Sequence, residues 1–101
     1  MENLTNQVTL GGTITKVYPI RYTPMRVAVS SFVVEHQSRQ VEAASACAVK
    51  CRVYCVMLGM NEDEVSQLVN KLVTVSGFLS QNVKQQLVLH VVNLSIIAQP
   101  I

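Results

Sequence analysis

Hydrophobic and polar residues alternate along several separate stretches of this chain. Val8, Leu10, Gly12 and Ile14 alternate with polar or small residues at the odd positions from 7 to 15. A period of two is typical of a strand with one buried face. A second stretch of this kind runs from about Val27 to Gln37. We predict a strand over each stretch.

The alternation is clearest between Cys47 and Leu58. Cysteine and apolar side chains occupy one face of this stretch, and Lys50, Arg52 and Tyr54 occupy the other. This pattern predicts a third strand. The last two strands are predicted over 71–80 and 86–97.

A helical pattern covers Asn61–Asn70, between the third and fourth predicted strands. Asn61 is a favourable N-cap, and Glu64 stands where a capping-box partner belongs. Apolar residues follow at i, i+3, i+4 and i+7, which predicts one stripe that covers a barrel end: Val65, Leu68, Val69 and Leu72. Five strands with one helix in this position indicate an all-β, five-stranded OB-type barrel, formed as one domain by residues 1–101.

The segments between the predicted strands differ in character. Pro19 and Pro24 bracket a loop that presents Arg21 and Tyr22 together. Residues 37–46 are small or polar and show no period, so we expect a mobile hairpin loop there. Gly77 is expected to mark a bend or bulge in the fourth strand.

The composition is unusually apolar for a chain of 101 residues. Half of the residues are hydrophobic and 14% are charged, whereas about 25% is usual in a soluble domain. We therefore expect part of the surface to be covered by a second copy in a homodimer. The net charge of +2 means that any affinity for nucleic acid must come from a local patch. A polar N-terminus and the lack of a long apolar run predict a cytoplasmic protein.

Some residues suggest a catalytic or metal-binding site, but a structural role explains them better. Cys47, Cys51 and Cys55 lie four residues apart, and on a strand each step spans about 13 Å, too far for two thiols to share one metal. We expect all three to pack in the core as small hydrophobic residues. Glu35 and His36 are adjacent, so their side chains point to opposite faces of a strand. We expect no metal, no cofactor and no enzymatic activity.

A binding face is the remaining candidate for function. Lys50, Arg52 and Tyr54 form a row on the third strand, and OB-folds bind oligonucleotides mainly on their second and third strands and nearby loops. Cations neutralise phosphates and an aromatic ring stacks on a base, which suits a single strand. Five further residues would extend the groove: Lys16, Arg21, Tyr22, Arg26 and Lys84. An ordinary solvated face explains the same pattern equally well.

Several local strings resemble the family of primosomal replication protein N, the PriB-type single-strand-binding proteins of bacterial replication restart. The resemblance extends from Val8 to Ile96, and it is carried by the order and spacing of strings at 8–13, 19–24, 32–36, 73–79 and 87–90. It implies a homodimeric OB-fold that binds single-stranded DNA and contacts the restart helicase PriA. In some bacteria it also implies contact with the loader protein DnaT.

The chain departs from the family pattern at positions that contact DNA. Lys50 stands where well-known members carry tryptophan, and Gln37 replaces an expected basic residue. The loop before the last strand retains only Lys84. These departures leave open a second hypothesis, a protein-interaction scaffold of the primosome with weak or lost DNA binding. A general single-strand-binding protein is a third, less favoured because the chain ends at Pro100 and Ile101 without an acidic tail.

Overall fold

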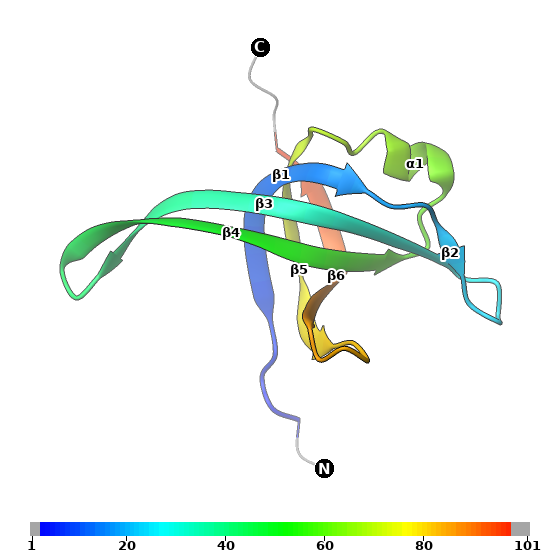
Figure 1. Ribbon diagram of the computed structural model, residues 1–101, viewed down its shortest axis with the longest axis horizontal. Helices are drawn as coiled ribbons and strands as arrows, with labels where there is room; N and C mark the ends of the chain where they lie inside the picture. The colour runs from blue at the N-terminus through cyan, green and yellow to red at the C-terminus, as the bar shows by residue number, and fades with distance from the viewer. Residues whose placement is uncertain (1–2, 98–101) are drawn as a thin grey trace.

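The computed structural model describes residues 3–97, which form six strands and one short helix at the edge of the molecule (Figure 1). The elements are β1 Val8–Val17, β2 Arg21–Tyr22, β3 Ala28–Glu42, β4 Ser45–Leu58, α1 Glu62–Ser66, β5 Leu72–Gln81 and β6 Leu87–Ile96. The predicted first to fifth strands correspond to β1, β3, β4, β5 and β6. The helix lies between β4 and β5, as predicted.

Five of the strands close into a barrel. The pairing order is β1-β5-β6-β4-β3, and β3 returns to pair with β1. β1 serves both neighbours, because its first half pairs with β5 and its second half with β3, with a register shift between Ile14 and Lys16. A short parallel pairing of Cys55 with Leu89 and Val56 with His90 closes the ring. The predicted OB-type barrel is confirmed.

The barrel interior is filled by side chains from every long strand. Phe32, Ile14 and Leu89 are completely buried, together with several valines. Leu68 follows the helix and packs into the same cluster. Truncating a buried ring such as that of Phe32 to alanine costs about 3–5 kcal/mol, so the core is the main support of the fold.

The helix is shorter than predicted, although its start is as expected. Asn61 Oδ1 accepts from the Glu64 amide at 2.8 Å, and Glu64 Oε1 accepts from the Asn61 amide at 3.2 Å, which completes the capping box. The helix ends at Ser66, and Asn70 takes a positive φ of 66°. Its amide donates to the Ile14 carbonyl at 2.7 Å, which fixes the chain to the barrel. The predicted stripe is therefore incomplete, because Val69 is 40% exposed.

The hairpin predicted at 37–46 is confirmed, but its residues form strands and not a loop, apart from the two-residue turn. β3 and β4 pair without interruption from Val29 with Leu58 to Glu42 with Ser45. The hairpin projects beyond the barrel as an arm, on the left of Figure 1. Backbone hydrogen bonds hold two strands together whatever their side chains are, so a segment without hydrophobic alternation can still be a strand. The turn consists of Ala43 and Ala44, both at positive φ.

Gly77 occupies the bulge that the sequence predicts. The β5–β6 register shifts between Ser76 and Gly77, and the backbone of His90 approaches Gly77 so closely that a Cβ would overlap its carbonyl group. Glycine permits this approach because it has no side chain. No helix in the part of the chain described by the structure is long and apolar enough to cross a membrane.

Candidate nucleic-acid interface

A groove of about 920 Å³ lies on the outer surface of the barrel, beside β4 and the β5–β6 turn. Its lining residues come from segments that are far apart in the sequence. Those with charged or aromatic side chains are Tyr18, Arg21, Arg52, Tyr54, Lys84 and His90. We call this surface the groove.

Strand geometry explains how β4 supplies two of these side chains. Arg52 and Tyr54 are two residues apart, so they share the face opposite the buried Cys55. Tyr54 pairs across the sheet with Val33 of β3. Arg21 reaches the groove from β2, which adds to the edge of β3 through the pairing of Arg21 with Val29.

Three side chains form a cluster at the β1 side of the groove. The rings of Tyr18 and Tyr54 meet edge to face, with centroids 5.7 Å apart and an interplanar angle of 67°. Lys16 Nζ lies 4.8 Å from the centroid of the Tyr18 ring, within cation–π distance. Tyr18 is absent from the predicted site. The sequence does contain a sign of this cluster, because Lys16 and Tyr18 are two positions apart at the end of the first strand and so point to the same side.

The β5–β6 turn is closed by hydrogen bonds of the Asn82 side chain. Asn82 Oδ1 accepts from the amides of Lys84 at 2.9 Å and Gln86 at 3.0 Å. The Asn82 side-chain amide also donates to the Gln86 side-chain oxygen at 3.1 Å. These bonds replace the sheet ladder at the turn and hold Lys84 at the groove.

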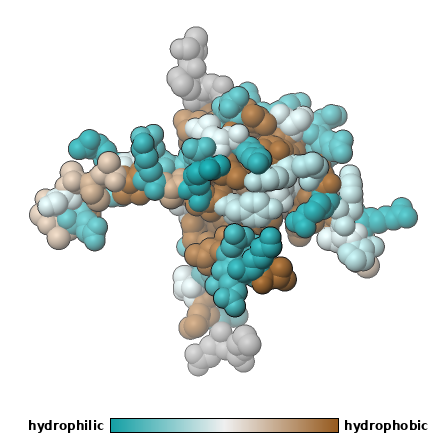
Figure 2. Space-filling view, in the orientation of Figure 1, coloured by the Kyte–Doolittle hydropathy of each residue, from teal (hydrophilic) through white to brown (hydrophobic). Residues whose placement is uncertain are grey.

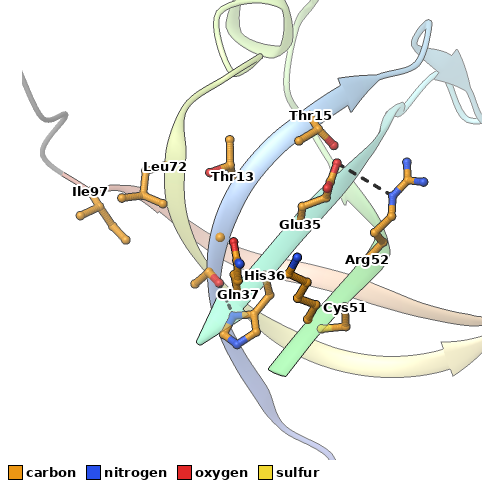
Figure 3. Close-up of a pocket in the computed structure, with 12 residues that line it drawn as sticks. Thr13, Thr15, Glu35, His36, Gln37, Cys51, Arg52, Leu72 and Ile97 are labelled. Carbon is orange, nitrogen blue, oxygen red and sulfur yellow. Dashed lines mark hydrogen bonds and ion pairs between the residues drawn. The ribbon is translucent and has the colours of Figure 1, made fainter. Parts of the chain in front are cut away.

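A second depression, of about 740 Å³, lies at the base of the arm (Figure 3). Lys50 lines this depression and not the groove, whereas Arg52 lines both. Figure 3 shows Glu35 of β3 and Arg52 of β4 reaching toward each other, with Arg52 Nε 3.9 Å from Glu35 Oε2. Both side chains are well exposed to solvent, so this ion pair contributes little to stability.

His36 also borders the second depression, but its ring nitrogens are already engaged. Nδ1 lies 2.6 Å from the Gly11 carbonyl oxygen and Nε2 lies 2.7 Å from Ser38 Oγ. A carbonyl only accepts, so the neutral ring carries its proton on Nδ1 and Nε2 accepts from the Ser38 hydroxyl. The ring thus links β1 to the base of the arm, which is a structural role.

The three cysteines lie on one face of β4, but the prediction that all of them pack in the core holds for Cys55 alone, because the other two lie where β4 extends beyond the barrel. Cys51 is exposed, Cys47 is half-buried and Cys55 is buried in the core. Burial raises the pKa of the Cys55 thiol to about 12. Among residues 3–97, no three cysteine, histidine or acidic side chains lie close enough together to hold a metal ion.

The structure brings together most of the predicted binding residues. Arg21, Arg52, Tyr54 and Lys84 line the groove, and Lys16 joins them through its contact with Tyr18. Three predicted residues lie elsewhere. Lys50 belongs to the second depression, and Tyr22 and Arg26 line neither surface.

Charge is distributed in favour of an anionic ligand. Three of the chain's acidic residues, Glu62, Asp63 and Glu64, stand in the first turn of α1. None of the groove's lining residues is acidic, although Glu35 pairs with Arg52 at its border. Figure 2 shows polar side chains over the middle of the barrel with apolar side chains between them. The groove therefore combines cations with aromatic and apolar contact surface.

The fold and the sequence both match known single-strand-binding proteins. A family model described as "another single-strand binding protein family" matches residues 6–93. The replication restart protein PriB of Neisseria gonorrhoeae is 35% identical over 83 residues, which cover 82% of this chain and 83% of that protein.

Solved structures agree on the fold. PriB from Ralstonia solanacearum superposes with a TM-score of 0.81 at 21% identity, covering 92% of this chain and 98% of that chain. A dimeric structure of the N-terminal domain of PriB from Thermoanaerobacter tencongensis gives a TM-score of 0.66 at 19% identity, covering 93% of this chain and 98% of that chain. From the family match over residues 6–93 and the identity to curated PriB proteins, the chain belongs to the PriB family of single-strand-binding proteins.

Proposed function

We propose that this protein binds single-stranded DNA in the groove and acts, without catalysis, as an accessory of replication restart. The observation that carries the proposal is the gathering of Arg21, Arg52, Tyr54 and Lys84 in one groove from three separate segments. Relatives named replication restart protein PriB support the biological setting.

The groove offers a single strand both kinds of contact that it needs. Arg21, Arg52 and Lys84 neutralise phosphates from both sides of the groove. The tyrosine pair offers ring surface on which a base can stack without being identified. Such binding tolerates any sequence, as a protein acting at stalled forks requires.

The proposal includes a homodimer. In the described residues, the first half of β1, from Val8 to Gly12, has a strand partner on one side only, where it pairs with β5. A second copy can add to this free edge and cover apolar surface. We further propose that the dimer contacts the PriA helicase, and DnaT where that loader is present, and stabilises the helicase on DNA.

Titration of a labelled oligothymidine, followed by fluorescence anisotropy at 50 and 200 mM salt, tests the groove. Three phosphate contacts give a slope of log affinity against log salt of about −2, so affinity falls roughly 20-fold over this range. Arg21→Ala, Arg52→Ala or Lys84→Ala each weakens binding and reduces the slope by about 0.7.

Lys71→Ala is the matched control, because it removes one positive charge from a residue that lines neither surface. It leaves affinity nearly unchanged. Equal losses for Lys71→Ala and Arg52→Ala would show that only net charge matters and would refute the groove. The oligomeric state of each protein is measured in the same samples by light scattering.

A protein-interaction scaffold is the second candidate function. It is favoured by exposed apolar side chains at the groove, since Val83 is fully exposed and Leu87 is 62% exposed. Pull-down with PriA from nuclease-treated extract separates the two functions. Helicase capture together with no measurable oligonucleotide affinity would establish the scaffold, whereas salt-dependent oligonucleotide binding supports the DNA-binding function.

A further inference from the structure

We infer that the stacked rings of Phe78 and His90 form a second base-stacking subsite, on the β5–β6 side of the groove. The inference rests on the proposed binding of single-stranded DNA and adds a place where a nucleobase is held. The ligand is a nucleobase of an extended strand whose phosphates follow the groove cations.

The two rings are arranged as a platform. Phe78 of β5 and His90 of β6 are register partners, their ring centroids are 4.9 Å apart, and the ring planes differ by 3°. Parallel rings leave an outer face at each end of the stack. A flat base can extend such a stack.

Packing within the barrel does not account for Phe78. Its side chain is 43% exposed, whereas its neighbours on the core side, Leu89 and Val91, are 0% and 5% exposed. Large aromatic rings bury more apolar surface than other side chains, so an exposed ring gives up much of its stabilising effect. An exposed phenylalanine held parallel to a histidine is better explained by contact with a ligand.

The platform continues the groove. His90 lines the groove and pairs with Val56 of β4, which also lines it. Tyr54 stands two residues before Val56 on the same face. His90 lies on the strand next to β4, opposite Val56, which is two residues from Tyr54. Standard strand spacing therefore puts the Cα atoms of Tyr54 and His90 about 8 Å apart. One short oligonucleotide can therefore reach both the tyrosine pair and the Phe78–His90 stack.

The test compares ring-keeping and ring-removing substitutions. His90→Val and Phe78→Thr each remove a ring and introduce a β-branched residue that suits a strand. Each is expected to weaken oligothymidine binding by about fivefold or more, with the salt slope unchanged because no phosphate contact is lost. His90→Phe retains the stack and is expected to bind within about twofold of the unchanged protein.

Two controls show whether the loss of affinity comes from a lost contact with a base. Val92→Thr changes an exposed residue of β6 that does not line the groove, and it leaves affinity unchanged. An oligonucleotide of the same length made of abasic units binds the unchanged protein and His90→Val equally, because it has no base to stack. Photocrosslinking of the unchanged protein to 5-iodouracil-containing DNA adds a measurement that needs no variant, and it yields adducts at Phe78 or His90.

The outcomes separate this inference from the proposed function. If Arg52→Ala weakens binding while His90→Val and Phe78→Thr do not, the subsite is refuted and the groove stands. Equal losses on the abasic strand, or photoadducts confined to other residues, also refute the subsite. If the unchanged protein shows no salt-dependent binding of oligothymidine, both the proposed function and the subsite are refuted.

Discussion

Replacement of Gly77 with alanine tests how closely β5 and β6 approach at the bulge. The added Cβ would overlap the carbonyl group of His90 and lie 3.1 Å from the Val91 Cα. These are backbone atoms of a paired strand, so they cannot rotate away as a flexible side chain can. The two strands must separate, and the separation disturbs the buried Leu89 and Val91 on β6.

The expected cost follows from forced overpacking. Inserting a methyl group into a closely packed site costs about 1–3 kcal/mol. For a domain of this size, each kcal/mol lowers the melting temperature by roughly 4–8 °C, so Gly77→Ala is expected to melt roughly 5–20 °C lower. Gly11→Ala is the matched control, because the nearest atom to its Cβ is the Val73 carbonyl oxygen at 3.8 Å. At a position without strain this change stabilises a protein by about 0.4–1 kcal/mol.

Thermal and urea unfolding followed by far-ultraviolet circular dichroism measures both variants. All samples are kept at one protein concentration, because the midpoint of an associating protein depends on it. Equal stability of the two variants, or a greater loss for Gly11→Ala, would refute the reasoning. Such a result would mean that β5 and β6 are farther apart at the bulge than the structure indicates.

Three further predictions concern the binding surface, the arm and the core. Glu35→Gln removes a carboxylate from the border of the groove and frees Arg52 from its ion pair. Fluorescence anisotropy is expected to show about two- to fivefold tighter binding of oligothymidine. Glu42→Gln, which removes a carboxylate from the arm, serves as the control. Ala43→Asn combined with Ala44→Gly supplies the residues that a type I′ turn prefers at positive φ. The double variant should slow hydrogen exchange of the backbone amides along the arm, and unchanged exchange would contradict the turn type. Burial raises the pKa of the Cys55 thiol from 9.0 in the unfolded chain to about 12 in the folded protein. The buried neutral thiol therefore contributes fully to folding stability below pH 9, and this contribution is lost as the pH rises toward 12. Between pH 8 and 10 the unchanged protein should lose about 1.4 kcal/mol more stability in urea than Cys55→Ala, and parallel losses would show that the thiol is not shielded.

Local signals were enough to predict the barrel. The alternation in β1 and β4, the capping box at Asn61 and the bulge at Gly77 each follow from residues close together in sequence, and the structure confirms all three. The arm could not be predicted in this way. Its strands lack alternation, and Ala43 and Ala44 stand where a hairpin turn usually carries asparagine and glycine.

The groove depends on long-range contacts that single segments do not encode. Alternation correctly puts Lys50, Arg52 and Tyr54 on one face of β4, but the arm carries Lys50 to the second depression. The predicted site lacks Tyr18, which lies between the predicted first strand and Pro19. Its role depends on Tyr54, a contact between residues 36 positions apart that only the closed barrel creates.

In the proposed binding mode, the small number of cations in the groove determines how the affinity for a single strand divides between charge and stacking. With Arg21, Arg52 and Lys84 as the phosphate contacts, affinity falls roughly 20-fold between 50 and 200 mM salt. The contribution of ring contacts is not lost in this way, because stacking releases no counterions. As salt rises, the remaining affinity therefore depends increasingly on the tyrosine pair and on the Phe78–His90 stack. A chain with 14% charged residues and no tryptophan in its sequence can bind a single strand at high salt only if these rings contact bases.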